Sequence, residues 1–106
     1  MKIILNIYHI LKKEEWGSAR EAGVYRGESL AKEGFIHCCT HDQIQGVLRQ
    51  WFHGQNNLLL LEINPDLLDA EVRYEKPSGA DEKFPHIYGP ITLKAVVGEI
   101  TMNSNY

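Results

Sequence analysis

The segment LLLLEI, from Leu58 to Ile63, constrains the fold of this chain more than any other stretch. Five of its six residues are apolar, and Asn64 and Pro65 break the pattern directly afterwards. A short, continuous apolar run of this kind is typical of a strand that is buried on both faces, as in the middle of a sheet. The chain has 106 residues, enough for one modest core and too few for two, so we predict a single domain over residues 1–106.

Helical periodicity is clearest between residues 40 and 54. Thr40 and Gln43 match a capping box, in which each side chain satisfies a backbone group at the start of a helix. Gly54 is placed to end this helix. Two further short helices are expected over residues 13–22 and 27–33, each followed by a glycine. The apolar side of the helix after Thr40 is predicted to comprise Ile44, Val47, Leu48, Trp51 and Phe52.

Alternating apolar residues predict further strands around these helices. In the first strand, over residues 2–11, His9 continues the apolar face and lies near the strand's end. Residues 76–83 are polar and contain proline and glycine, which predicts a loop, and residues 103–106 are expected to form a loose tail. The result is an α+β fold with about five or six strands and two or three short helices. The other strands are expected over residues 35–39, 70–75, 84–90 and 91–102.

Composition and charge argue against several classes of partner. The net charge of −3 disfavours a nucleic-acid platform, which usually carries a basic stripe, so RNA is a less favoured partner. No apolar run approaches the ~20 residues that cross a bilayer, and the apolar N-terminal run lacks the small-residue cleavage site of a signal peptide. Cys38 and Cys39 are adjacent, so on a strand they point to opposite faces and a disulfide between them would be strained. We therefore expect a reducing, cytoplasmic location and no membrane partner.

The segment GFIHCCTHDQ, residues 34–43, raises the question of a metal site. On a strand, His37 and Cys39 share a face, and His41 could join them from the start of the next helix. Zinc needs three or four nitrogen or sulfur ligands in tetrahedral geometry. The usual spacing between ligand pairs is missing and Cys38 points away, so we expect no metal and interpret the cysteines as small buried residues.

A cysteine nucleophile is a second interpretation of the same segment. Cys39 lies just before a helix start and close to a histidine, two features that can lower the pKa of a thiol. No oxyanion-binding arrangement is identifiable around it in the sequence, so nothing further supports this role.

A third interpretation joins histidines from three separate segments into one site. His9 ends the first predicted strand, His37 lies on the next, and His86 lies in the extended segment FPHIYGP. Neutral imidazole offers one donor and one acceptor, which suits ribose hydroxyls, a nicotinamide amide or phosphate oxygens. Tyr25 and Tyr88 could add a stacking face and a hydroxyl. The three histidines therefore form the most specific candidate site.

Several segments resemble domain-of-unknown-function family nine-five-two, a family of bacterial and plant proteins, over nearly the whole chain. GFIHC followed by FPHIYGP is the most specific part of the resemblance. Cys39 stands where the family usually has serine. This difference argues against an essential thiol, and equally against an essential serine hydroxyl, at this position. The matching segments are IYHI (7–10), EEW (14–16) with Ala19, Tyr25 with SLAKEGFIHC (29–38), QGVLRQWFHG (45–54), LLLLEI, VRYE (72–75) and FPHIYGPI (84–91).

The resemblance implies an ADP-ribosyltransferase-like fold, in which a split β-sheet holds NAD in a cleft. In that superfamily a histidine on the first strand holds the nicotinamide ribose, an aromatic residue stacks on nicotinamide, and a late glutamate aids transfer. His9 resembles the first of these and Tyr25 the second. The glutamate has no clear counterpart, because Glu62 and Glu75 occupy positions typical of solvent-facing strand residues. GFIHC is also similar to the RNA 2'-phosphotransferase branch, in which basic residues matter more than a glutamate.

We therefore expect a cleft lined by histidine and tyrosine that binds NAD or a related nucleotide, with ADP-ribosyl- or phosphotransferase-like chemistry. His9 and His37 would bind ribose or phosphate, with Tyr25 stacking. His86 would act as acid or base, aided by His37, and Tyr88 would complete the cleft. The alternative is a non-catalytic binding module on the same fold, which the missing acid favours. In a purely structural interpretation, the histidines satisfy buried backbone groups.

Overall fold

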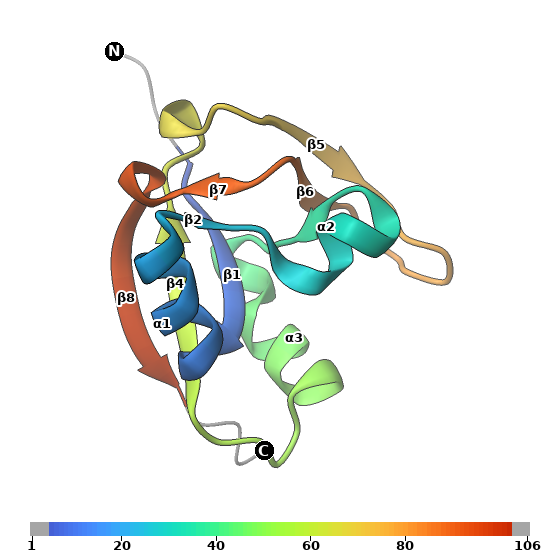
Figure 1. Ribbon diagram of the computed structural model, residues 1–106. Helices are drawn as coiled ribbons and strands as arrows, with labels where there is room; N and C mark the ends of the chain where they lie inside the picture. The colour runs from blue at the N-terminus through green and yellow to red at the C-terminus, as the bar shows by residue number, and fades with distance from the viewer. Residues whose placement is uncertain (1–4, 103–106) are drawn as a thin grey trace.

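The computed structural model describes residues 5–102, in which short helices pack against small β-sheets (Figure 1). Within these residues the strands form three small antiparallel sheets. The α+β class is confirmed. The predicted tail at 103–106, and the start of the predicted first strand at 2–4, lie outside the described residues. In chain order the elements are β1 (Ile7–Lys12), α1 (Lys13–Ala22), β2 (Val24–Tyr25), α2 (Gly27–Glu33), β3 (Ile36–His37), α3 (Ile44–Trp51), β4 (Leu58–Ile63), β5 (Glu71–Glu75), β6 (Phe84–Tyr88), β7 (Ile91–Thr92) and β8 (Val96–Met102).

The predicted central strand, β4, does lie between two others, in the sheet order β1-β4-β8. Its side chains alternate between two buried clusters: Leu61 and Ile63 pack into one, Leu58 and Leu60 into the other. All four are at most 4% exposed. α1 contributes to the first cluster and α3 to the second, so a helix covers each face of β4. Alternation along one apolar strand thus generates both halves of the core.

The helices α1 and α2 occupy the predicted residues. α1 ends at Gly23 and α2 at Gly34, whose φ angles of 86° and 89° lie in the left-handed region that favours glycine. α1 buries Trp16 and Ala19, as the spacing predicts. Both helix ends are therefore set by local sequence.

α3 follows a 3-10 turn in which the Gln43 side chain accepts a hydrogen bond from the Thr40 N–H at 2.9 Å, as the capping box predicts. Ile44 and Leu48 in its first two turns are buried. The prediction that Trp51 belongs to the buried side is wrong, because this side chain is 66% exposed. α3 packs on the sheet through its first turns, and Trp51 at its last residue lines a groove instead.

A second sheet has the order β3-β6-β5 and carries different chemistry on its two faces. Ile36 and Ile87 pair in register and are completely buried against the first core cluster. The next pair, His37 and His86, points to the opposite face because neighbouring strand residues alternate. Register and alternation place further side chains on this second face, namely Phe84 and Tyr88 from β6 and Glu71, Arg73 and Glu75 from β5.

A single β-bridge joins the two three-stranded sheets. The backbone groups of Tyr8 on β1 and Cys39 after β3 exchange two hydrogen bonds, each 2.8 Å long. The bridge brings His9, the residue after Tyr8, close to His37. The histidines of β1, β3 and β6 therefore approach one another although they are far apart in the sequence.

The predicted last strand over residues 91–102 is interrupted, and this prediction is wrong. A 3-10 turn, Leu93–Ala95, separates β7, which pairs with β2, from β8, which pairs with β4. The turn is fixed because the Ala95 carbonyl accepts a hydrogen bond from the Asn64 N–H at 2.9 Å and Ala95 is completely buried. The predicted strand at 35–39 likewise shrinks to the two residues of β3. These short pairings raise the number of strands within residues 5–102 to eight, above the expected five or six.

No helix within residues 5–102 is both long enough and apolar enough to cross a membrane.

Candidate functional site

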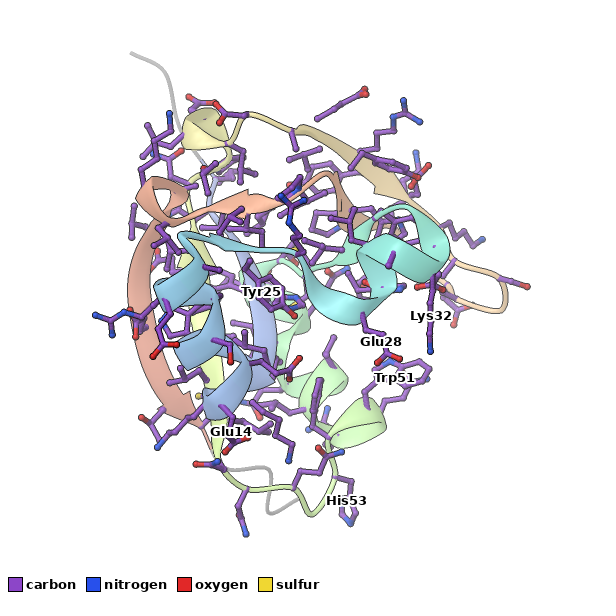
Figure 2. The ribbon with its side chains drawn as sticks, in the orientation of Figure 1. Glu14, Tyr25, Glu28, Lys32, Trp51 and His53 are labelled. Carbon is purple, nitrogen blue, oxygen red and sulfur yellow. The ribbon has the colours of Figure 1, made fainter. Side chains whose placement is uncertain are left out.

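A groove of about 880 Å³ opens between α2, α3 and the loop at residues 76–83. This volume lies in the range of small-molecule sites, roughly 300–1,000 Å³. His9, His37 and His86 all line it, so the structure brings together the three histidines singled out in the sequence. Trp51 forms part of the α3 side, and Figure 2 shows its indole projecting towards α2. Tyr25 and Tyr88, the other expected site residues, are not among the lining side chains.

His9 is held by hydrogen bonds at both ring nitrogens. Its Nδ1–H donates to the His37 carbonyl oxygen at 2.6 Å, which leaves Nε2 to accept from the Tyr25 hydroxyl at 3.1 Å. Burial lowers the pKa of His9 to about 4, so the ring is neutral near pH 7. Tyr25 is buried beneath it, 7% exposed, and cannot offer a free face for stacking. His9 and Tyr25 form a structural pair that leaves no free ring nitrogen on His9 for ribose.

His37 is oriented by the end of α2. Its Nε2 lies 2.6 Å from a carboxylate oxygen of Glu33, four residues earlier, and the side chain is about half exposed. The ring meets those of Phe35 and His86 edge-on, with centroids 4.9 and 5.3 Å away. Because Glu33 also lines the groove, the two side chains form one polar wall.

His86 is the buried member of the site, with only 3% of the residue exposed. Its Nδ1 lies 2.8 Å from Glu75 Oε1, and the Phe35 ring stacks on it with a centroid separation of 4.2 Å and an interplanar angle of 18°. Its Nε2 is buried and has no hydrogen-bond partner within residues 5–102. A buried polar atom left without a partner costs about 1–3 kcal/mol, so such atoms are rare unless a site uses them.

Glu75 links His86 to Tyr88. The Tyr88 hydroxyl donates to Glu75 Oε1 at 2.5 Å, the same oxygen that faces His86. The hydrogen bonds from Tyr88 and His86 lower the pKa of Glu75, so it is a carboxylate at neutral pH. The Arg73 guanidinium lies over the Tyr88 ring, 4.5 Å from its centroid. The Glu75 side chain is 39% exposed, so it faces solvent as expected, but its carboxylate also contacts His86 and Tyr88.

The signal for Glu75 was present in the sequence. Two alternating segments flank the polar loop at 76–83, a pattern that predicts a hairpin. Pairing them would place Glu75 and His86 on one face, diagonal to each other. The stacking of Phe35 on His86 could not be found in this way, because Phe35 precedes β3 and the packing of that segment depends on the whole fold.

The charges around the groove are predominantly negative. Its lining includes the carboxylates Glu33, Asp81 and Glu82, and no lysine or arginine among the described residues. Glu62 and Glu75, the strand glutamates considered for the late acid, are not among the lining side chains. The groove therefore offers hydrogen-bonding and aromatic groups to a ligand, but no strong cation for a phosphate.

Both cysteines line the groove as free, buried thiols. Burial raises the pKa of Cys39 to about 12 and that of Cys38 well above its ordinary value. Since the thiolate is the reactive form, this environment opposes the interpretation of Cys39 as a nucleophile. Within residues 5–102 no group of three or more His, Cys, Asp or Glu side chains is arranged to hold a metal ion.

Comparison with solved structures shows that this fold is similar to that of a protein from Caulobacter crescentus. The crystal structure of protein CC0527 from Caulobacter crescentus is 32% identical, covers 92% of this chain and 86% of its own, and superposes with a TM-score of 0.82. The solution NMR structure of CC0527 gives 32% identity, coverage of 92% and 84%, and a TM-score of 0.80. No curated protein matches the chain. The family model described as "Protein of unknown function (DUF952)" matches residues 10–99, and the chain belongs to this family.

Proposed function

We propose that the groove binds NAD or a related nucleotide through its nucleoside part. The observation that carries this proposal is the buried Nε2 of His86, a polar atom without a partner within residues 5–102 on a residue that lines the groove. A ribose hydroxyl or the amide of a base would satisfy it. Such convergence of apolar surface and a few polar groups is the usual composition of a ligand site.

The walls of the groove favour a flat ring. Trp51, Phe52 and Phe84 supply aromatic surface, and Tyr8 contributes from β1. Aromatic side chains stack on heterocyclic bases, and this stacking is worth about 1–3 kcal/mol per base in nucleic-acid sites. Because the lining contains three carboxylates and no lysine or arginine among the described residues, we infer that the phosphates of a nucleotide would project into solvent.

The superfamily assignment and the transfer chemistry belong to this proposal as well. ADP-ribosyl or phosphoryl transfer would need a group to stabilise charge on the sugar or phosphate. His86 could serve as acid or base. Of the carboxylates that line the groove, Glu33 contacts a histidine, with an oxygen 2.6 Å from the Nε2 of His37. Two free, buried thiols are consistent with the reducing, cytoplasmic location that we expect.

A non-catalytic binding module is the second candidate function. One observation favours it: neither Glu62 nor Glu75 is among the lining side chains, so the late acid of the transferases has no counterpart in the groove. Chromatography that measures the release of nicotinamide from NAD distinguishes the two candidate functions. Turnover that His86→Ala abolishes would support transfer, whereas binding without release would support the module.

Thermal unfolding in the presence of nucleotides tests the proposed binding. A ligand that binds only the folded state stabilises it by ~2.7 kcal/mol at a hundredfold excess over its dissociation constant. For a chain of this size that corresponds to a rise in the melting temperature on the order of 10 °C. We expect such a rise with at least one of NAD, ADP-ribose, adenosine and nicotinamide riboside.

Two variants and one control localise the binding to the groove. His86→Ala should abolish the rise, and Trp51→Ala should reduce it with little effect on unfolding in the absence of ligand, because Trp51 is 66% exposed. His53→Ala is the matched control, because His53 is exposed and points away from the groove in Figure 2. Equal rises in all four proteins would place the ligand elsewhere, and no rise with any compound would contradict the proposal.

A further inference from the structure

We propose that Glu75 positions His86 so that its Nε2 is a hydrogen-bond acceptor for the ligand. The inference rests on the proposed function, because it states how the same groove recognises its ligand. Glu75 itself is not among the lining side chains of the groove and acts through His86. It is therefore a positioning residue.

The tautomer follows from the chemistry of the contacts. A carboxylate accepts hydrogen bonds and cannot donate them, so the 2.8 Å contact between Glu75 Oε1 and His86 requires the hydrogen on Nδ1. A neutral imidazole carries one ring hydrogen, and Nε2 is then left with its lone pair. In this neutral form the Nε2 of His86, which is buried and has no partner within residues 5–102, is an acceptor.

The strand register explains why Glu75 reaches this histidine. Glu75 pairs with Phe84, and His86 lies two residues further along β6 on the same face, in the diagonal position. Phe35 stacks on one side of the imidazole and the His37 ring meets it edge-on, so the ring is confined by packing as well as by its hydrogen bond.

Tyr88 and Arg73 hold the carboxylate in turn. The Tyr88 hydroxyl donates to the same Oε1, at 2.5 Å, and the Arg73 guanidinium lies over the Tyr88 ring. Arg73 also donates to Glu71 Oε1 at 3.0 Å, which fixes the guanidinium. The sheet face therefore supports His86 through a chain of contacts that ends at the buried Nε2.

This arrangement specifies the chemistry of the ligand group that would reach the Nε2 of His86, a residue that lines the groove. An acceptor selects a group with a hydrogen to donate, such as a ribose hydroxyl or the NH₂ of an amide or an adenine. A ligand with only acceptors at this point would leave Nε2 unsatisfied. The site should therefore prefer adenosine or nicotinamide riboside to analogues in which the donating group is methylated.

Nitrogen NMR of the ligand-free protein tests the positioning directly. Long-range correlations between the carbon-bound ring hydrogens and the two ¹⁵N-labelled ring nitrogens distinguish the two neutral tautomers of histidine from each other and from the imidazolium. We expect His86 to show a protonated Nδ1 and an unprotonated Nε2 at pH 7.5, and to lose this preference in Glu75→Ala. Glu75→Gln, which keeps an acceptor oxygen, should retain part of it.

Glu99→Ala is the control, since Glu99 is an exposed glutamate on β8 and takes no part in the contacts that hold His86. It should leave the tautomer unchanged and the affinity for adenosine and nicotinamide riboside within twofold. Glu75→Ala should weaken the binding of both nucleosides at least tenfold in calorimetry.

The outcomes separate this inference from the proposed function. A hydrogen on Nε2 of His86 in the wild type, or a tautomer unaffected by Glu75→Ala, overturns the inference whatever binds. Nucleoside binding that Glu75→Ala leaves unchanged also overturns it, and the proposed function then stands. Failure of the wild type to bind either nucleoside contradicts the proposed function, while the tautomer still decides whether Glu75 positions His86.

Discussion

Lowering the pH from 7 to 4 is expected to reduce the free energy of unfolding by about 3 kcal/mol through His9 alone. Burial lowers the pKa of this ring from its ordinary 6.5 to about 4 in the folded protein. Between these values the unfolded chain binds a proton at His9 and the folded chain does not, so acidification favours unfolding. Each pKa unit corresponds to ~1.36 kcal/mol, and the loss is complete once the pH falls below about 4.

Urea unfolding of the wild type and His9→Gln across this pH range measures the effect. Other groups contribute to acid unfolding, including Glu75, whose pKa is lowered, but they are common to both proteins. His9→Gln should be the less stable protein at pH 7, because it disturbs the hydrogen bonds to His37 and Tyr25. The stability difference between the two proteins should shrink by about 3 kcal/mol on acidification. Parallel curves would show that the pKa of His9 is not lowered in the folded protein, and would contradict this prediction.

Replacing Ile87 by alanine is expected to destabilise the protein by about 3 kcal/mol, within the 2–5 kcal/mol typical of buried isoleucine-to-alanine changes. Ile87 is completely buried in the first core cluster and pairs with Ile36 across the strands. Its neighbours along β6 are His86 and Tyr88, which point to the opposite face. Truncation removes apolar contacts and leaves a cavity directly behind the site.

Ile87→Val is the control for this prediction, because it removes one methylene and should cost only about 1 kcal/mol. Chemical denaturation of the three proteins under the same conditions gives both differences. Ile87→Ala should also weaken any ligand that depends on His86, because the strand supporting that histidine loses its packing. A loss below about 1 kcal/mol for the alanine variant would mean that β6 is not anchored through this face.

Much of the fold could be predicted because local signals were strong. LLLLEI identified the central strand, and the glycines after α1 and α2 marked the ends of both helices. The interruption of the last strand could not be predicted, because the hydrogen bond from Asn64 to Ala95 joins residues distant in sequence. Trp51 fitted the helical spacing of a buried residue, and spacing alone cannot distinguish a core from the wall of a groove.

The candidate site was predictable in part for the same reason. Three histidines on separate predicted strands could be proposed as a cluster, and all three do line one groove. Of their partners, Tyr25 reaches His9 only through tertiary packing, whereas the hairpin pattern already indicated that Glu75 lies diagonal to His86. Sequence could not tell which histidine keeps a free nitrogen, because that depends on contacts made by every neighbour.

The central claim is that a nucleotide occupies the groove beside His37 and His86. An NMR titration with NAD, observing the ring C–H signals of the histidines, tests it most directly, because exposed His53 serves as an internal reference within the same sample. The account predicts that the His37 and His86 signals shift in a saturable manner while the His53 signals stay in place. Ring signals of His37 and His86 that remain unmoved at millimolar NAD would contradict it.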